Sequence, residues 1–311
     1  MLSNEKILIT GPASQVAEPI TAALAKNNEV WGIARFSDPV ARGRLEAVGV
    51  RCVAVDLVAG DFSALPDDFS LAMNFAVMKS NVFDRDIAGN VEGTGLLMHH
   101  CRNARAFLHC SSTAVYEPND HEPLAETDML GDNHKPFGFL PTYSICKIAA
   151  EGMARYAARQ WNLPTTIARL NVPYGGNGGW PAFHLALMKM GRPIPVHENA
   201  PSQYCPIHED DILAHLPALI DAASVPATIV NWGGDEVVSI EEWCAYLGEL
   251  TGLEPSFEPT QNTIESAVID TTKMHELIGG TSVGWRDGMR RMVATLHPDM
   301  LGQDTTPRSG H

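Results

Sequence analysis

Residues 7–17 read Ile7-Leu-Ile-Thr-Gly-Pro-Ala-Ser-Gln-Val-Ala17, and this stretch decides the expected fold. Three apolar residues indicate a short strand, a glycine marks the turn, and a helical pattern begins directly behind it. The same alternation of short apolar runs and helical patterns continues through the first half of the chain. Such alternation is typical of a parallel sheet with crossover helices. The sequence therefore predicts an α/β protein built on a doubly wound parallel sheet.

The apolar runs give the positions of the strands and helices. Strands are expected at Lys6–Ile9, Glu29–Ile33, Arg51–Val55, Leu71–Phe75, Ala106–Cys110 and Thr165–Leu170. Helices are expected at 15–26, 37–48, 88–103 and 142–161. After residue 170 the pattern becomes irregular, apart from a helix near 181–190.

The length of 311 residues exceeds what one hydrophobic core usually supports, so we expect a large lobe and a smaller one. Residues 1–170 are assigned to the sheet domain, with segments that return to it near 203–235. Residues 171–297 are assigned mainly to the smaller lobe. The polar tail 298–311 is expected to be disordered.

The composition is that of a soluble globular protein, with 45% apolar and 19% charged residues. A net charge of −15 argues against nucleic acid or an anionic membrane as partner, because phosphate contacts need clustered Lys and Arg. The first strand begins at Lys6, which leaves no room for a signal peptide. No apolar stretch reaches the ~20 residues of a membrane-spanning helix. We therefore expect a cytoplasmic protein.

Cysteine and histidine give no sign of a disulfide framework or of a metal site. The six cysteines contain no C-x-x-C pair and are expected to be free and buried. The twelve histidines show neither H-E-x-x-H nor another paired-ligand spacing. No metal is expected.

The run Pro141-Thr-Tyr-Ser-Ile-Cys-Lys147 places Tyr143 and Lys147 four residues apart on an expected helix, so both side chains project from one face. An ammonium group beside a phenol favours the phenolate. Such a tyrosine can exchange a proton with an alcohol or a carbonyl while a cofactor carries the hydride. The spacing also occurs on ordinary amphipathic helices, so the surrounding motifs decide its meaning.

Several further motifs accompany this pair in a fixed order. They are Asn90-Val-Glu-Gly-Thr94, Ser111-Ser112 with Val115-Tyr116, Arg169–Gly175, His208–Asp211 and Val230–Ser239. Together they resemble the extended short-chain dehydrogenase/reductase family, also called the NAD-dependent epimerase/dehydratase family, over nearly the whole chain. The resemblance implies an enzyme with a Rossmann-type sheet, a smaller C-terminal substrate lobe and a bound dinucleotide.

The turn after the first strand departs from the family's Thr-Gly-x-x-Gly-x-x-Gly motif. Thr10 and Gly11 match it, whereas Ser14 and Ala17 replace the second and third glycines. A small third residue still permits helix–strand packing, and the Ser14 hydroxyl can donate to a phosphate. The resemblance implies that the cofactor is bound here by Thr10, Gly11, Ser14, Gln15 and Val16.

The end of the second strand bears on the choice between NAD and NADP. Ala34 stands where NAD-specific relatives carry an acid, and Arg35 follows it. Arginine suits a 2′-phosphate through charge and paired hydrogen bonds, so we expect NADP, with NAD possible. The resemblance implies further cofactor contacts at Asp56, Leu57, Phe75, Ala76, Lys79, Asn90, Tyr143 and Lys147.

The resemblance also implies a catalytic set of Ser112, Tyr143 and Lys147. Ser112 would hydrogen-bond the reacting oxygen, Tyr143 would give or take the proton, and Lys147 would assist Tyr143 and hold the nicotinamide ribose. Sugar dehydratases of the family carry an acid directly after the catalytic Ser or Thr. Here Thr113 and Ala114 follow, so dehydration is not expected.

The expected substrate is not a nucleotide sugar. Tyr204 stands where nucleotide-sugar enzymes of the family carry an arginine, and residues 253–270 contain no Arg or Lys. A buried diphosphate without cations would be poorly compensated. The remaining candidates are aromatic or polar, and they suit a small carbonyl compound or alcohol, although each could equally belong to the lobe's core. They are Asn171, Tyr174, Trp180, Phe183, His184 and Tyr204, together with Ser112.

Three functions remain open. The first is an NAD(P)-dependent oxidoreductase that interconverts a carbonyl and a secondary alcohol, and the alternative is an NAD-dependent sugar epimerase. The third is a non-catalytic dinucleotide sensor, which is disfavoured because such proteins usually lose the Tyr/Lys pair. The identity of the substrate is not given by the sequence.

A homodimer is also expected, because relatives of this kind pair two helices across a two-fold axis. The second of these helices offers an apolar stripe that could instead pack against the chain's own sheet. The stripe consists of Ile145, Ala149, Met153 and Tyr156.

Overall fold

The computed structural model describes residues 2–136 and 138–301. Its main sheet contains seven strands in the order β12-β6-β5-β4-β1-β2-β3, and every neighbouring pair is parallel. The strands are β1 Lys6–Thr10, β2 Glu29–Ala34, β3 Arg51–Ala54, β4 Leu71–Asn74, β5 Ala106–Ser112, β6 Thr165–Leu170 and β12 Thr228–Trp232. From β1 the order runs one way through β2 and β3 and the other way through β4 and β5. The predicted Rossmann-type, doubly wound α/β fold is therefore confirmed, and its switch point lies between β1 and β4.

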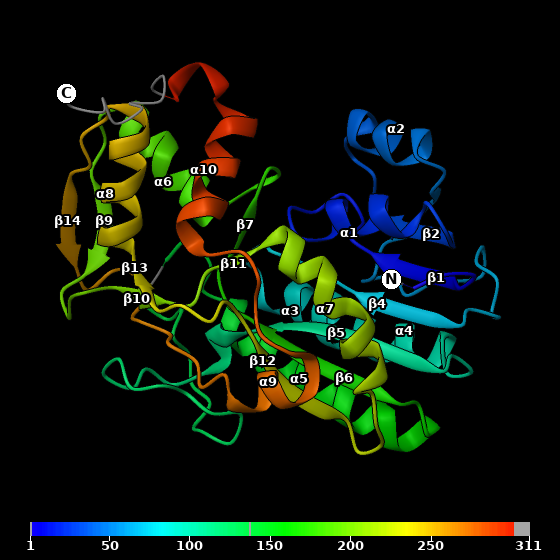
Figure 1. Cartoon of the computed structure of the whole chain (residues 1–311). Helices are drawn as coiled ribbons and strands as arrows, with labels where there is room; N and C mark the ends of the chain where they lie inside the picture. The colour runs from blue at the N-terminus through cyan, green and yellow to red at the C-terminus, as the bar shows by residue number, and fades with distance from the viewer. Residues whose placement is uncertain (1, 137, 302–311) are drawn as a thin grey trace.

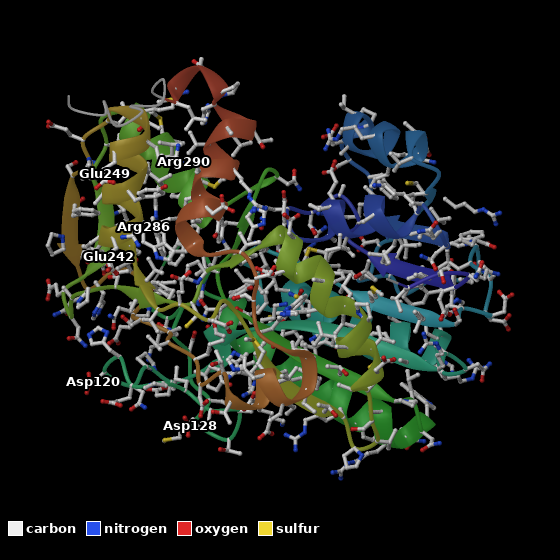
Figure 2. The ribbon with its side chains drawn as sticks, viewed as in Figure 1. Asp120, Asp128, Glu242, Glu249, Arg286 and Arg290 are labelled. Atoms are coloured by element: carbon white, nitrogen blue, oxygen red, sulfur yellow. The ribbon has the colours of Figure 1, made fainter. Side chains whose placement is uncertain are left out.

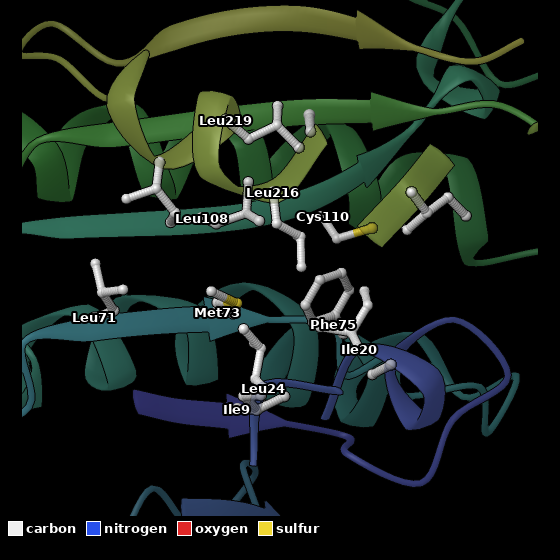
Figure 3. Packing of buried hydrophobic residues seen from close by; sticks show 14 of the residues in the cluster. Ile9, Ile20, Leu24, Leu71, Met73, Phe75, Leu108, Cys110, Leu216 and Leu219 are labelled. Carbon is white, nitrogen blue, oxygen red and sulfur yellow. The ribbon is translucent and has the colours of Figure 1, made fainter. Parts of the chain in front are cut away.

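Helices cover both faces of this sheet (Figure 1). They are α1 Ala17–Leu24, α2 Pro39–Ala47, α3 Phe83–Ile87, α4 Gly93–His100, α5 Tyr143–Trp161, α7 Glu209–Asp221 and α9 Thr272–Ile278. Along β1, Ile7 and Ile9 join one buried cluster with residues of α1 and α7, whereas Leu8 joins another with residues of α4 and α5. Figure 3 shows the first cluster. Because side chains alternate along a strand, apolar residues at successive positions bury both faces of the sheet.

Sequence patterns located these elements to within about two residues at most ends, which is the usual uncertainty of element boundaries. The expected helix 88–103 is different. It opens as a π-helical turn, Ala88–Glu92, and α4 ends at His100. Asn90 Nδ2 donates to the Asp86 carbonyl (2.8 Å), and Thr94 Oγ1 donates to the Asn90 carbonyl (2.6 Å). In a regular α-helix these two carbonyls would accept from the backbone amides four residues later. Here the side chains of those later residues also bond to them, which is consistent with the wider π-helical turn.

A second hydrophobic core belongs to the smaller lobe, drawn at the upper left of Figure 1. Its helices are α6 Trp180–Lys189, α8 Ile240–Thr251 and α10 Trp285–Leu296. Its short strands are β7 Pro173–Gly175, β8 Gly178–Gly179, β9 Ile194–His197, β10 Gln203–Tyr204, β11 Ile207–His208, β13 Val238–Ser239 and β14 Phe257–Thr260. The chain enters this lobe after β6, returns to the sheet for β12, and returns again when α9 packs on α7 and β12.

The expected disordered tail lies largely outside the described residues. Pro298–Met300 form a short 3-10 turn, and residues 302–311 are not described. In the described ranges, no helix is long and apolar enough to cross a membrane. All six cysteines are free, and five of them are buried.

Candidate active site

A cavity of about 610 Å³ opens at the carboxyl ends of β1, β2, β4, β5 and β6. This is where ligands bind in open α/β sheets, outside the switch point of the strand order. Most of the predicted site residues line it. They are Gly11, Ser14, Gln15, Val16, Arg35, Asp56, Leu57, Phe75, Ala76, Lys79, Ser112, Tyr143, Lys147 and Asn171.

The turn at Gly11 requires glycine for two reasons. Its φ of +61° lies in the left-handed region, and a Cβ added there would come within 3.0 Å of the Ala76 Cα. The end of β1 and the segment after β4 therefore approach each other closely beside the cavity. Ser14 follows in the turn, and its hydroxyl accepts from the Ala17 amide (3.3 Å) at the start of α1.

Two predicted cofactor contacts, Thr10 and Asn90, do not reach the lining. Thr10 is buried, and its hydroxyl donates to Asn74 Oδ1 (2.6 Å) while accepting from the Phe75 and Ala76 amides. Asn90 Oδ1 accepts from the Met78 amide (2.8 Å), and its Nδ2 donates to the Met78 carbonyl (3.0 Å). Both side chains hold the segment that follows β4, because their polar atoms are used by its backbone.

Some charged side chains of the cavity lining form hydrogen bonds within the protein, and others form no ion pair. Asp38 and Asp56 each accept a hydrogen bond from a nearby backbone amide. Lys147 Nζ donates to the Cys110 carbonyl (2.7 Å). Within residues 2–136 and 138–301, neither Arg35 nor Lys79 forms an ion pair. The cavity of this acidic protein therefore offers two cations that are available to an anionic ligand.

Tyr143 is the first residue of α5, and Lys147 lies one turn later. The Lys147 ammonium is 5.9 Å from the centre of the Tyr143 ring, and the Lys79 ammonium is 5.7 Å from it. Ser112 ends β5, and its Oγ accepts from the Ala114 amide (3.2 Å). Because that oxygen is an acceptor in this contact, its O–H can still donate to a ligand. The structure thus brings the three predicted catalytic side chains to one cavity.

A buried ion pair fixes α5 to the sheet. Glu151 of α5 receives two hydrogen bonds from Arg169 of β6 (2.7 and 3.0 Å) and a third from Ser111 of β5 (2.5 Å). Burial alone would lower the pKa of Arg169, but the hydrogen bonds and charge of Glu151 raise it above its ordinary value. The pair ties the helix that begins with Tyr143 to β6, and the Ser111 hydrogen bond ties it to β5, the strand that ends with Ser112.

Asp38 and His134 are among the residues near the site that were not predicted. Asp38 lines the cavity beside Arg35 and caps α2, and an Asp-Pro pair at a helix start could have indicated it. His134 lies in the irregular segment before α5, where no sequence pattern marks it. Its ring centre is 4.8 Å from that of Tyr143, and its Nδ1 is 3.0 Å from Ser144 Oγ. Burial, with a contribution from Lys79, lowers the pKa of His134 to about 4, so the ring is neutral at neutral pH.

The predicted substrate residues divide into two groups. Asn171 and Ser112 line the cavity, whereas Tyr174, Trp180, His184 and Tyr204 do not. Tyr204 donates to the Glu265 carbonyl (2.9 Å), and His184 Nδ1 accepts from the Trp243 indole (3.0 Å). Burial lowers the pKa of His184 to about 3. These aromatic side chains fill the core of the smaller lobe, because a lobe of this size needs them to bury enough apolar surface.

Asn171 also differs from the expectation in its bonding. Its Nδ2 donates to Thr113 Oγ1 (3.2 Å) and to the Ala267 carbonyl (2.8 Å). Its Oδ1 accepts from the Val172 and Cys205 amides. Both donors and both lone pairs of the amide are therefore used inside the protein. In the described part of the chain, no group of three or more His, Cys, Asp or Glu could hold a metal ion.

Comparison with known proteins gives one family and many structures. The family model described as "NAD dependent epimerase/dehydratase family" matches residues 7–193. No curated protein matches the chain.

The solved structures most similar to this chain include three sugar-nucleotide epimerases. UDP-glucuronic acid 4-epimerase from Bacillus cereus, in complex with UDP-glucuronic acid and NAD, has a TM-score of 0.80 and 19% identity over 93% of this chain and 98% of that one. UDP-glucose 4-epimerase from Thermotoga maritima, with UDP-glucose, has a TM-score of 0.79 and 18% identity over 94% and 99%. UDP-N-acetylglucosamine 4-epimerase from Methanobrevibacter ruminantium M1, in complex with UDP-N-acetylmuramic acid, has a TM-score of 0.82 and 15% identity over 96% and 100%. At these identities the likeness shows the fold.

Proposed function

The chain belongs to the NAD-dependent epimerase/dehydratase family, and from this premise we propose that its cavity binds NAD(P) and interconverts an alcohol and a carbonyl group on a small substrate. The observation that carries the proposal is that Ser112, Tyr143 and Lys147 share one cavity with the Gly11 turn. A proton-transferring set beside a dinucleotide turn suits hydride-transfer chemistry.

The lining fits a dinucleotide. Because residue 11 is glycine, the turn after β1 packs directly against Ala76 in the cavity wall, where the backbone of the turn would meet a phosphate of the cofactor. Neither Lys79 nor Arg35 forms an ion pair in the described chain; Lys79 would compensate negative charge on a bound dinucleotide, and Arg35 would meet the 2′-phosphate of NADP. When bound, the cofactor would supply the site that accepts and returns a hydride.

The protein's side chains would handle the proton and the developing charge. Tyr143 Oη would take the proton of a substrate alcohol or return it to a carbonyl oxygen. The Lys147 ammonium, held by the Cys110 carbonyl, lies 5.9 Å from the centre of the Tyr143 ring, where it would hold the nicotinamide ribose of the cofactor. The Ser112 hydroxyl would donate to the same substrate oxygen and stabilise its negative charge.

Epimerisation is the first candidate form of this reaction. In an epimerase the substrate would be oxidised transiently, with its hydride held by the cofactor and its proton by the same side chains, and then reduced on the other face without net consumption of cofactor. The comparisons support this form better than net oxidation or reduction, because the similar solved structures are 4-epimerases. It is therefore favoured over the oxidoreductase expected first from the sequence.

A net oxidoreductase is the second candidate, and the chemistry of the smaller lobe supports it. The polar atoms of Asn171 are all hydrogen-bonded to described residues. Tyr204, which stands where nucleotide-sugar enzymes of the family carry an arginine, is buried. The basic residues Arg286 and Arg290 lie on α10, which packs against the helix that carries Glu242 and Glu249 (Figure 2). Neither arginine lines the cavity. A diphosphate-linked sugar would find few cations on this side of the site.

One assay separates the two forms. The purified protein is incubated with NAD(P) and a panel of sugars, carbonyls and alcohols, and both cofactor absorbance at 340 nm and substrate isomers are followed. Isomer exchange without net absorbance change supports epimerisation, whereas stoichiometric absorbance change supports the oxidoreductase. Absence of cofactor binding would overturn both.

We expect UDP and GDP to bind more weakly than micromolar. A diphosphate needs a well-placed cation or several backbone donors, and the loop Gly175–Gly179 is the main source of such donors that the sequence offers in this lobe. Calorimetric titration with UDP and GDP, in the presence of saturating NAD(P), measures this. Micromolar affinity for either nucleotide would point to a nucleotide-sugar epimerase.

NADPH is expected to bind more tightly than NADH, because Arg35 is exposed in the lining, forms no ion pair with any other described residue, and follows Ala34, which offers no acid. Replacing Arg35 by alanine should cost about 1.5–3 kcal/mol for NADPH alone. Fluorescence titration with both cofactors measures the difference. Arg44→Ala is the matched control, since Arg44 pairs with Glu18 outside the lining. Equal weakening for NADH would refute the assignment of Arg35 to the 2′-phosphate.

A homodimer through α4 and α5 is also expected. Ile145 and Tyr156 of the predicted stripe are 38% and 60% exposed, and Leu96 of α4 is 45% exposed, which leaves apolar surface for a second copy. Multi-angle light scattering over a dilution series should give the mass of two chains. A monomer at every concentration would mean that the stripe serves only its own chain.

A further inference from the structure

A buried carboxylate lies close to the site without belonging to its lining. Asp86, on the short helix α3, has a relative exposure of 0%. It appears in none of the ion pairs formed within the described ranges. Burying an ionised carboxylate without a basic partner is costly unless several donors replace its water. The groups that donate hydrogen bonds to Asp86 therefore show which segments the carboxylate holds in place.

Four hydrogen bonds reach the two oxygens of Asp86. Oδ1 accepts from the Ser80 amide (2.8 Å) and the Ser80 hydroxyl (2.6 Å). Oδ2 accepts from the Asn81 amide (3.0 Å) and the Thr142 hydroxyl (2.7 Å). Burial raises the pKa of Asp86, but the bonds from Ser80, Thr142 and Asn81 outweigh it and hold the pKa below its ordinary value.

These donors come from two segments that meet at the cavity. Ser80 and Asn81 directly follow Lys79, whose side chain lines the cavity. Thr142 directly precedes Tyr143. The Asp86 carboxylate therefore contacts a residue next to Lys79 and a residue next to Tyr143. On the other side of Lys79, the backbone of Met78 is held by Asn90 at both its amide and its carbonyl. The backbone is thus held on both sides of Lys79, by Asn90 before it and by Asp86 after it. Asp86 also joins this segment to the start of α5.

We propose that Asp86 is a positioning residue that fixes the Lys79 ammonium over the cavity, beside the ring of Tyr143, for contact with an anionic cofactor. The inference rests on the proposed function, because it takes the ligand to be NAD(P). Lys79 has a flexible side chain and is solvent-exposed, so its backbone position decides where its charge can reach. The carboxylate acts through this backbone and does not touch the ligand.

The direction of the effect distinguishes positioning from direct electrostatics. Replacing Asp86 by asparagine removes a negative charge near the site, which by itself would strengthen the binding of an anion. The new amide keeps one acceptor oxygen but turns its NH₂ toward the other pair of donors, so the bond from one backbone amide, that of Ser80 or that of Asn81, is lost. If Asp86 positions Lys79, binding weakens in spite of the charge change.

The test is fluorescence titration with NADH and NADPH on the full chain. Lys79→Met is expected to weaken binding by about five- to tenfold, as for a lost charge-assisted bond at an exposed site. Asp86→Asn should weaken it severalfold in the same direction. The double variant should bind no more weakly than Lys79→Met, because both changes remove one interaction. A residue with only a structural role would give additive losses.

Two further variants keep the test decisive. Asp84→Asn makes the same charge change on an exposed position of α3 and should leave the affinity unchanged. Thr142→Val keeps the Asp86 carboxylate and removes one of its donors, so it should weaken cofactor binding slightly. This variant tests the inference if Asp86→Asn does not fold. Unchanged or tighter binding in Asp86→Asn, or normal binding in Lys79→Met, overturns the inference. A wild-type chain that binds neither cofactor overturns the proposed function as well.

Discussion

Replacing Tyr143 by phenylalanine is expected to lower turnover by about 10²–10⁴-fold, the range typical of losing a general acid or base. The variant lacks only the hydroxyl that exchanges the proton, while the ring still packs on His134 and lies near Lys147. Cofactor affinity should therefore stay close to that of the wild type. The measurement is kcat on the substrate found in the panel, together with fluorescence titration of NAD(P)H.

Tyr156→Phe is the matched control for this result. Tyr156 lies on the same helix, is 60% exposed, and donates only to Gln160 at 3.4 Å. It should retain normal turnover. Near-normal turnover in Tyr143→Phe would remove the central claim about the reaction, whereas equal losses in both variants would indicate damage to α5.

Replacing Glu151 by alanine is expected to lower the free energy of unfolding by about 3–5 kcal/mol, as when one partner of a buried ion pair is removed. Glu151 and Arg169 have side-chain exposures of only 4% and 2%, and their closest atoms are 2.7 Å apart. The alanine variant leaves the guanidinium buried, with the Glu126 carbonyl as a remaining acceptor and the Tyr116 ring 4.8 Å away. Urea unfolding followed by circular dichroism measures the difference.

Glu46→Ala provides the comparison, because Glu46 pairs with Arg42 on an exposed helix face. That pair should contribute little to stability, because exposed ion pairs are screened by solvent. The double variant Glu151→Leu with Arg169→Met should be more stable than Glu151→Ala, since no charge is left buried. A loss below about 1 kcal/mol in Glu151→Ala would show that water or rearrangement satisfies Arg169.

The sheet was predictable because its signals are local. Each central strand is a short apolar run buried on both faces, so β6 was predicted with its observed bounds, Thr165–Leu170. The turn at Gly11 follows from a glycine directly after a strand, and the Tyr143/Lys147 pair follows from helical spacing. These features depend on neighbouring residues, which the sequence displays directly.

The bonding around the cavity could not be predicted in the same way. Thr10 and Asn90 carry polar groups at the expected places, but partners from β4 and the segment after it use those groups. Asn171 meets Ala267 and Cys205, which are far from it in the sequence. A motif gives the type of a residue, whereas the availability of its polar atoms depends on every segment that packs against it.

By itself, the sequence determined the order of strands and helices up to residue 170, the doubly wound sheet and the placement of Tyr143 and Lys147 one turn apart on a helix. Only the tertiary structure decided that Tyr174, His184 and Tyr204 fill a core instead of a ligand site, and that Asp86 joins the neighbours of Lys79 and Tyr143. Periodicity arises from local backbone geometry, so it can be read along the chain. Burial and hydrogen-bond partners arise from packing between distant segments, and they are fixed only when the chain has folded.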